Sequence, residues 1–275
     1  MKTYEENYSI LLSHVLTTGQ ARPSRVGNTI SVFGAHLAIP DLREGHFPLL
    51  TTRRMFVQGQ LGELAAFLRG ADDVATFQKF GCKFWNANAA AWTENVLRPP
   101  EKHKVGRVYG VQWRDWNYTY DQLSVLVNGI KSDPYGRRHI LTTWNPSELN
   151  RMCLPPCHIL AQFYVDVDGY LDCMVYMRSV DLCLGLPSDV VLYAALLCLV
   201  AKETGYKPGT LKFSFGDAHI YEAHVPQLKK QLCRLPNTRP TYELEPTTRL
   251  FNFQPDDFTF SDYFPHERID YELLV

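Results

Sequence analysis

Hydrophobic residues recur at helical spacing in several parts of the chain. Residues 1–20 show this spacing, and so do residues 57–69, which read VQGQLGELAAFLR. Residues 121–132, DQLSVLVNGIKS, predict a third helix, which ends at the turn sequence DPYG. The run 189–204 is apolar on every side and therefore predicts a helix buried in the centre of the protein.

Two neighbouring segments are rich in residues that favour strands. They read HILAQFYVDV and DGYLDCMVYM, and together they predict a hairpin that turns at Asp168 and Gly169. A further strand is expected in TLKFSFGDAHIYEAH, with His219 and Tyr221 near its end. Because helices and strands follow one another irregularly, we expect an α+β fold rather than repeated βαβ units. No internal repeat or linker divides the chain, which predicts a single domain over residues 1–275.

Composition narrows the possible partners. The 275 residues are 45% hydrophobic, which is enough for a large core. Their formal net charge of −1 disfavours non-specific electrostatic binding to nucleic acid. The N-terminus is too polar for a signal peptide, and we expect no membrane span and a cytoplasmic location. The seven cysteines are an odd number in mostly apolar surroundings, which indicates reduced thiols rather than disulfides.

One cysteine lies in an unusually constrained stretch, RMCLPPCHIL. Pro155 and Pro156 restrict the backbone just before Cys157, so the thiol is held at the edge of a strand. Cys157 can be a nucleophile or an inert buried residue; a metal site shared with Cys153 is disfavoured because no second ligand pair has suitable spacing, and we expect no metal. A nucleophilic thiol needs nearby positive charge, since its ordinary pKa is about 8.5.

Arginines next to two of the expected strands are candidates for that charge. Arg137 and Arg138 lie in YGRRHI, and Arg178 lies in YMRSVD. Guanidinium groups match the oxygens of a phosphate, so the three residues predict a phosphate clamp if they converge. Ordinary surface salt bridges are the alternative.

Together these stretches resemble a known family. RVYGVQWRDW, DPYGRRHI, LPPCH followed by QFYV, YMRSVDLCLGLP and GDAHIYEAH resemble thymidylate synthase, in order and in spacing, over nearly the whole chain. The resemblance implies a mixed six-stranded sheet with flanking helices, and a homodimer whose interface is formed by that sheet. It also implies that each active site binds a nucleoside 5′-monophosphate and 5,10-methylenetetrahydrofolate.

The resemblance assigns roles to individual residues. Cys157 is implied as the nucleophile that attacks C6 of a pyrimidine, and Glu63 as the carboxylate that organises proton transfer. The nucleotide is implied to bind Arg25, Arg178 and Ser179 through its phosphate, Arg137 and Arg138 across the dimer interface, and His219 and Tyr221 through its sugar. The folate site is implied at Trp85, Asp181, Gly185, Ser188 and Val275, with the C-terminus closing over it.

These roles are chemically coherent, although several have simpler alternatives. A thiolate that adds across C5–C6 turns C5 into an enamine-like carbon able to attack an activated one-carbon unit. Glu63 is either a buried acid–base group or a solvated helix residue. Trp85, His219 and Tyr221 can each be packing residues, and His158 is expected to orient other groups or to lie in the core.

The sequence departs from the family at Asp189, in GLPSDVVLY. Thymidylate synthases have Asn there, whose amide matches uracil, whereas a protonated carboxyl can donate to N3 of cytosine and accept from its 4-amino group. The alternative is that Ser188 caps a helix and Asp189 lies in its first turn, a placement worth about 0.3–1 kcal/mol. We expect cytosine recognition, and hence dCMP as the substrate and Asp189 as a residue that stabilises charge at N3.

Two further departures concern the folate side. Ser188 replaces an aromatic residue and Asn88 replaces a second tryptophan, while Trp85 is kept. A wetter pocket favours attack by water over hydride transfer, so the expected product is 5-hydroxymethyl-dCMP, with 5-methyl-dCMP as the alternative. A family member specific for dUMP or CMP is also possible. An inactive nucleotide- or RNA-binding homologue is disfavoured because Cys157 and Glu63 are present, and a thiol hydrolase because Cys157 and His158 point to opposite faces of a strand.

Overall fold

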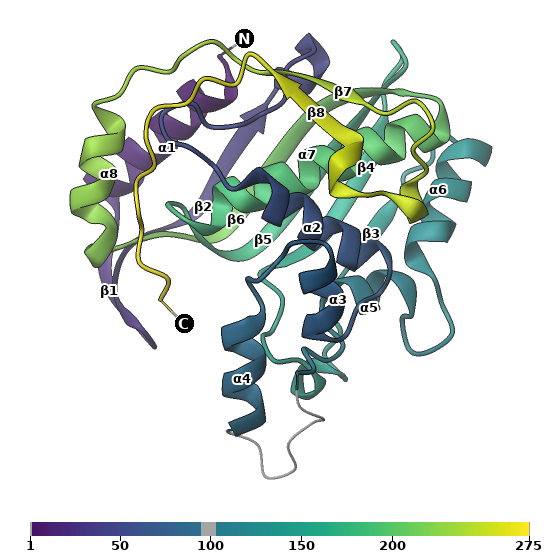
Figure 1. Ribbon diagram of the computed structural model, residues 1–275, viewed down its shortest axis with the longest axis horizontal. Helices are drawn as coiled ribbons and strands as arrows, with labels where there is room; N and C mark the ends of the chain where they lie inside the picture. The colour runs from purple at the N-terminus through teal and green to yellow at the C-terminus, as the bar shows by residue number, and fades with distance from the viewer. Residues whose placement is uncertain (1, 95–102, 275) are drawn as a thin grey trace.

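A six-stranded sheet forms the centre of the computed structural model, which describes residues 2–94 and 103–274 (Figure 1). Its strands lie in the order β1-β2-β6-β5-β4-β3. Their bounds are β1 Gln20–Ser24, β2 Gly27–Ile39, β3 Ile140–Thr142, β4 His158–Val165, β5 Tyr170–Asp181 and β6 Lys207–Tyr221. Strands β5 and β6 pair in parallel and the other neighbours pair antiparallel, so the sheet is mixed, as expected.

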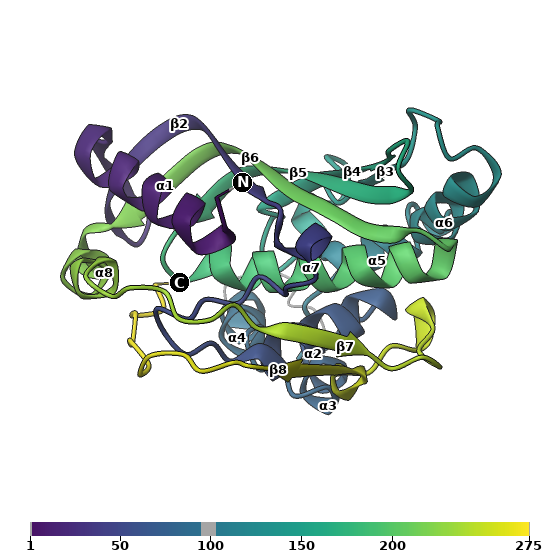
Figure 2. The ribbon, with the colours of Figure 1, turned by 90° about the horizontal axis from the view of Figure 1, so that it is seen from above.

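Helices α2 and α7 lie together on one side of this sheet, as Figure 2 shows. The described α-helices are α1 Tyr4–Thr18, α2 Val57–Leu68, α3 Val74–Lys79, α4 Asn86–Glu94, α5 Tyr109–Arg114, α6 Gln122–Ser132, α7 Gly185–Thr204 and α8 Val225–Leu232. Single 3-10 turns occur at Asp41–Glu44, Leu149–Arg151, Glu222–His224, Leu250–Asn252 and Pro255–Asp257. A separate two-stranded sheet pairs β7 Thr241–Leu244 with β8 Phe258–Ser261. The α+β architecture with flanking helices is confirmed.

Helix α7 connects the parallel strands β5 and β6 and is the centre of the core. It packs against α2 on one side and against both strands on the other, which explains why it is apolar all round. Within residues 2–94 and 103–274, α7 alone is long and apolar enough to cross a membrane, and most of it is buried in the fold. Its apolar surface is therefore used for packing.

The other predicted elements are found close to their expected positions. The three amphipathic segments form α1, α2 and α6, and the predicted hairpin forms β4 and β5. Gly169 in its turn has a φ of 80°, a conformation that favours glycine. Strand β6 ends at Tyr221, so His219 and Tyr221 lie at its carboxyl end.

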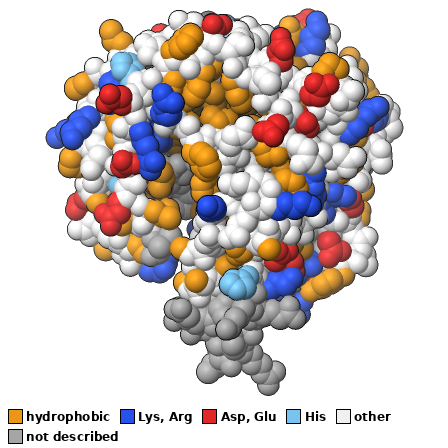
Figure 3. Space-filling model, viewed as in Figure 1, with side chains coloured by type: hydrophobic (Ala, Val, Ile, Leu, Met, Phe, Trp, Pro, Cys, Tyr) orange, Lys and Arg blue, Asp and Glu red, His pale blue; other side chains and the backbone are white. Residues whose placement is uncertain are grey.

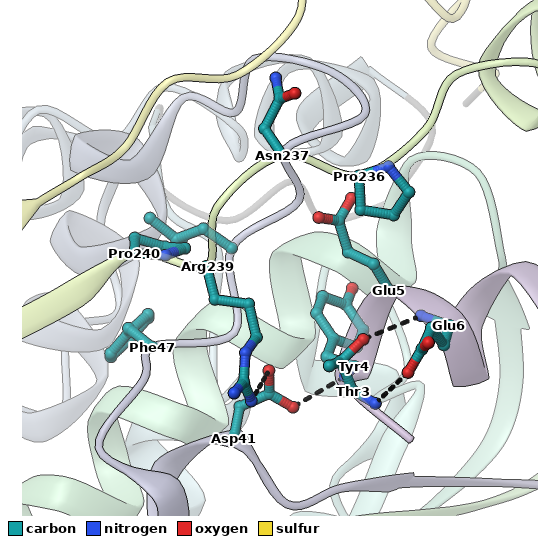
Figure 4. A pocket seen from close by; sticks show the side chains of 11 residues that line it. Thr3, Tyr4, Glu5, Glu6, Asp41, Phe47, Pro236, Asn237, Arg239 and Pro240 are labelled. Carbon is teal, nitrogen blue, oxygen red and sulfur yellow. Dashed lines mark hydrogen bonds and ion pairs between the residues drawn. The ribbon is translucent and has the colours of Figure 1, made fainter. Parts of the chain in front are cut away.

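The start of α1 is fixed by a polar cluster beside a pocket of about 260 Å³ (Figure 4). The Tyr4 backbone N–H donates to Asp41 at 2.8 Å, and Thr3 and Glu6 form a capping box. Arg239 forms an ion pair with Glu44 at 2.6 Å and lies 3.7 Å from Asp41. The charged groups here pair with one another, which indicates a structural role.

Candidate active site

The backbone around Cys157 is held by two neighbouring side chains. The Cys157 N–H donates to the hydroxyl of Tyr109, the first residue of α5, at 2.7 Å. Arg178 on β5 donates from Nε to the carbonyl of Pro156 at 2.7 Å and from Nη2 to that of Pro155 at 3.0 Å. Because three hydrogen bonds fix this loop, the thiol has a defined position just before β4.

The electrostatic setting of Cys157 differs in part from the expectation. Burial raises the pKa of the Cys157 thiol, and the Arg178 guanidinium opposes that rise while the Asp189 carboxyl adds to it. An arginine does favour the thiolate, as predicted. In the single chain, however, the cost of desolvation exceeds that help.

Glu63 lies on α2 at a point where the helix closely approaches the chain before α4. A Cβ on the preceding Gly62 would lie 2.1 Å from the carbonyl oxygen of Phe80, so only glycine permits this approach. The indole of Trp85 donates to Glu63 Oε1 at 2.7 Å. Burial raises the pKa of Glu63 to about 7, which allows the carboxyl group to exchange a proton near neutral pH.

Asp189 projects from α7 towards a neutral histidine. His158 Nε2 lies 3.8 Å from Asp189 Oδ1, and His158 Nδ1 forms a hydrogen bond of 2.7 Å with the hydroxyl of Tyr193. Burial lowers the pKa of His158 to about 3, so the ring is uncharged. Burial raises the pKa of Asp189 well above its ordinary value, and the nearby carboxyl of Glu63 adds to this effect. The protonated carboxyl is therefore favoured.

The helix-cap alternative for Ser188 and Asp189 is wrong. Helix α7 begins at Gly185 after the N-cap Leu184, so both residues lie inside the helix. The Ser188 hydroxyl donates to the carbonyl of Leu184, one turn back, at 3.2 Å. Only 19% of the Asp189 side chain is exposed, which is unlike a solvated residue in the first turn.

The parallel pairing of β5 and β6 brings the expected nucleotide residues together. Ser179 pairs with Asp217, and Asp181 pairs with His219. His219 Nδ1 donates to Asp217 at 3.0 Å, and the rings of His219 and Tyr221 lie 5.1 Å apart. Burial raises the pKa of Tyr221, and the charges of Asp181 and Cys157 raise it further while Arg25 lowers it. Arg25 is exposed in the turn between β1 and β2.

Arg137 and Arg138 occupy a different region of the same chain. Both are exposed in the segment before β3, where they line a cavity of about 550 Å³ with Tyr120 and Tyr135. In the described part of the chain, no hydrogen bond or ion pair joins either arginine to the loop that holds Cys157. Within one chain the three arginines therefore do not converge.

A second cavity, of about 380 Å³, lies between α2, the start of α7 and the C-terminal segment. Arg53, Arg54, Phe56, Phe84, Gln60, Leu184, Ser188 and Tyr271 are among its lining residues. Two buried polar atoms here, Arg53 Nε and Gln60 Oε1, have no hydrogen-bond partner among the described groups. The cavity has aromatic walls and three arginines, of which Arg268 is paired with Asp270 at 2.5 Å. With the unsatisfied polar atoms, this lining fits a flat conjugated ligand that carries carboxylates. In Figure 3 the molecule is hollowed beside the region of α4, and basic side chains border the hollow.

The remaining predicted folate residues border α7 and the C-terminal segment. Asp181 lies 3.7 Å from the position of a Cβ on Gly185, and its Oδ1 lies 3.7 Å from Nδ1 of His224. His224 Nε2 donates to the carbonyl of Glu272 at 2.8 Å, which ties the C-terminal segment to this region. Val275 lies outside the described residues.

Asp181, Cys183 and His224 bring atoms suited to a metal ion within 4.8 Å of one another. The Arg53 guanidinium donates to the carbonyl of Cys183 at 2.7 Å, and its charge acts against a bound cation. Burial acts to lower the pKa of His224, but the Asp181 carboxyl, with a smaller contribution from Glu272, outweighs burial and raises that pKa above its ordinary value.

Several site residues were not singled out from the sequence. Tyr109 lies inside the motif RVYGVQW, and Arg53 follows two threonines in TTRRM, but neither carries a distinctive local pattern. Gln60 lies three residues before Glu63, and this helical spacing was the available signal. Tyr193 is an unremarkable member of the apolar run.

Comparisons with known proteins identify the family of this chain. The family model described as Thymidylate synthase matches residues 6–275. A thymidylate synthase of Human herpesvirus 8 is 41% identical over 98% of this chain and 84% of its own length, and one of Corynebacterium aurimucosum is 40% identical over 98% of both chains. A bifunctional dihydrofolate reductase-thymidylate synthase of Leishmania major is 39% identical over 98% of this chain, which spans 55% of that protein.

The named relatives are thymidylate synthases, which points to dUMP rather than dCMP for them. Members of this family are soluble, generally dimeric enzymes that transfer a one-carbon unit from 5,10-methylenetetrahydrofolate to C5 of a pyrimidine nucleotide. The family match over nearly the whole chain and the identity to these relatives lead to one conclusion. The chain belongs to the thymidylate synthase family.

Proposed function

We propose that the protein transfers the one-carbon unit to dCMP and releases 5-hydroxymethyl-dCMP. The observation that carries this proposal is the buried carboxyl of Asp189, whose raised pKa favours the protonated form. Thymidylate synthases have an amide at this position. This change from an amide to a carboxyl at the base-reading position is the reason for proposing cytosine.

A protonated Asp189 matches the hydrogen-bonding edge of cytosine. Its O–H donates to N3 of cytosine, and its carbonyl oxygen accepts from the 4-amino group. Uracil presents an N3–H donor and an O4 acceptor. It pairs with the carboxyl only when the carboxyl proton lies on the other oxygen. The neutral His158 beside Oδ1 adds no positive charge that would ionise the acid.

The other residues act on the ring in sequence. The Cys157 thiolate adds to C6, and the electron pair that reaches the C4–N3 side is stabilised by the proton of Asp189. Glu63, with a pKa of about 7, moves protons at the C5 substituent. 5,10-Methylenetetrahydrofolate supplies the one-carbon unit when bound. Arg25, Arg178 and Ser179 bind the phosphate, and His219 and Tyr221 bind the sugar.

Attack by water, rather than hydride transfer, is favoured by the folate cavity. Ser188 and Gln60 form a hydrogen-bonded polar pair in its wall, at 3.0 Å, where Ser188 replaces an aromatic residue. We propose that Trp85, Asp181, Gly185 and Val275 contact the folate. Trp85 is retained and buried, so methylation to 5-methyl-dCMP is the outcome that would replace this one.

The active form is a homodimer in which each site receives Arg137 and Arg138 from the other subunit. Both arginines are exposed in the single chain and lie away from its own thiol. The sheet also exposes large apolar side chains, among them Phe33 on β2 and Met174 on β5. An apolar sheet face of this kind requires a cover, and a second copy buries it. All seven cysteines are free, which suits a reducing, cytoplasmic location.

The test is the choice of base by wild type and by Asp189→Asn. Purified protein is incubated with methylenetetrahydrofolate and with dCMP, CMP or dUMP, and kcat/KM is measured for each nucleotide. Wild type should prefer dCMP. Asp189→Asn should move the dCMP to dUMP ratio towards dUMP by about tenfold or more, because a mismatched buried polar contact costs about 1–3 kcal/mol.

Asp256→Asn is the matched control, because Asp256 is exposed in the turn Pro255–Asp257. It should leave the ratio unchanged. A wild-type preference for dUMP, or an Asp189→Asn variant that keeps the wild-type ratio, would contradict the proposal. Nucleotide binding without turnover would indicate an inactive homologue.

A further inference from the structure

The wall of the folate cavity contains an amide oxygen that lacks a partner. Gln60 on α2 is 3% exposed, and its Nε2 donates to the Ser188 hydroxyl at 3.0 Å. Its Oε1 is buried without a hydrogen-bond partner among the described groups. Leaving a buried acceptor unpaired costs about 1–3 kcal/mol, so this position calls for a donor in the assembled site.

The orientation of this amide follows from its neighbours. Ser188 Oγ lies 3.2 Å from the carbonyl of Leu184, which can only accept, so the single hydroxyl hydrogen is used there. Ser188 can then only accept from Gln60. The amino end of Gln60 must face Ser188, and its carbonyl end is left for another donor.

Gln60 is also placed next to the acid–base residue of the site. Residues three apart on a helix share a face, so Gln60 and Glu63 point to the same side of α2. The cavity of about 380 Å³ that Gln60 lines has room for a water molecule beside a ligand. A water that donates one hydrogen to Gln60 Oε1 is therefore placed on the side of α2 that also carries the Glu63 carboxylate.

We infer that Gln60 holds the water that attacks the one-carbon unit. This inference rests on the proposed hydroxymethylation and names a residue for its last step. At that stage the one-carbon unit is an exocyclic methylene on C5 of the pyrimidine, and Cys157 is bonded to C6. Gln60 fixes the water through one hydrogen, and Glu63 accepts the other.

The step is balanced without an oxidant or a reductant. The water oxygen forms a bond to the methylene carbon, and its proton passes to the Glu63 carboxylate. The electron pair of the exocyclic double bond moves into the ring, where Asp189 stabilises it. It then re-forms the C5–C6 double bond while the bond from C6 to sulfur breaks, and Cys157 leaves as a thiolate.

The test compares Gln60→Met with Gln58→Met in the full-length enzyme. Methionine keeps the length of the side chain but has no amide oxygen, and Gln58 is exposed on the same helix. With tritium at C5 of dCMP, a single turnover reports loss of the C5 hydrogen, which precedes water attack. Added 2-mercaptoethanol reports the methylene intermediate, because a thiol adds to the same carbon.

In Gln60→Met, formation of 5-hydroxymethyl-dCMP should fall by about tenfold or more. Tritium release and both KM values should stay within about twofold of wild type, and the thiol-trapped product should increase. These readouts separate loss of the water from misfolding, because a misfolded enzyme releases no tritium. Gln58→Met should behave like wild type.

Three results would overturn the inference. The first is Gln60→Met forming the hydroxymethyl product at the wild-type rate. The second is a rise of about tenfold in the folate KM with kcat unchanged, which would mean that Oε1 accepts from the folate. The third is loss of tritium release together with product. A wild-type enzyme that forms no hydroxymethyl product would instead refute the proposed function itself.

Discussion

Replacing Glu63 with Gln should stabilise the ligand-free protein above neutral pH. The carboxyl group accepts a hydrogen bond from the Trp85 indole, and burial raises its pKa from 4.5 to about 7. Gln keeps the oxygen that accepts from the Trp85 indole but cannot ionise. The variant therefore removes the cost of burying a charge and little else.

The size of the effect follows from the pKa. The difference between 4.5 and about 7 is about 2.5 pH units, and each unit corresponds to about 1.4 kcal/mol. The full cost is therefore about 3 kcal/mol, and the partial exposure of Glu63 reduces it to about 2 kcal/mol. Because the pKa of Glu63 is higher in the folded protein, the cost of burying its charge is absent below pH 4.5. The wild-type protein loses stability as the pH rises through 7.

Urea unfolding followed by circular dichroism measures this difference. Both proteins are compared at pH 5 and pH 8 at one fixed protomer concentration, because a dimer's stability depends on concentration. The advantage of Glu63→Gln should be below about 1 kcal/mol at pH 5 and about 2 kcal/mol at pH 8. An advantage that is absent at pH 8, or equal at both pH values, would refute the assignment of Glu63 as a buried acid with a raised pKa.

Three further predictions concern the thiol and the phosphate site. Cys157→Ala should abolish turnover while calorimetry still detects dCMP binding; residual turnover would contradict its role as nucleophile. Arg178→Met should slow alkylation of Cys157 by iodoacetamide at pH 8 relative to Arg178→Lys, because the charge lowers the thiol pKa; exposed Cys233 is the internal control, and equal rates would contradict that role. Mixing Arg138→Ala with Cys157→Ala chains should restore some activity through hybrid dimers, and no recovery despite proven subunit exchange would argue against a shared site.

The sequence predicted the elements whose burial is periodic or complete. Helix α7 was recognised because it is apolar on every side, and the hairpin of β4 and β5 because a turn with Gly169 joins two strand-forming runs. Strand β2 was missed although its buried residues partly alternate. Strand β1 is exposed along its whole length, and β7 and β8 have four residues each, which is too short for their alternation to be distinctive.

The site was predictable as a set of residues but not as a set of contacts. Family resemblance pointed to Cys157, Glu63 and Asp189, whereas the bond between Gln60 and Ser188 joins residues 128 positions apart and leaves no local pattern. The raised pKa values of Glu63 and Asp189 come from burial, which only the folded chain defines. The alternative that Ser188 caps a helix was wrong because α7 starts at Gly185, and helix ends are weakly encoded.

The central claim is tested most directly by the product that wild type forms from dCMP and methylenetetrahydrofolate in water labelled with ¹⁸O. Mass spectrometry of the nucleotide reports the mass of the new group, and absorbance reports dihydrofolate. The account predicts 5-hydroxymethyl-dCMP with the heavy oxygen in its CH₂OH group and no dihydrofolate. An unlabelled 5-methyl-dCMP formed one-for-one with dihydrofolate, or turnover of dUMP alone, would contradict it.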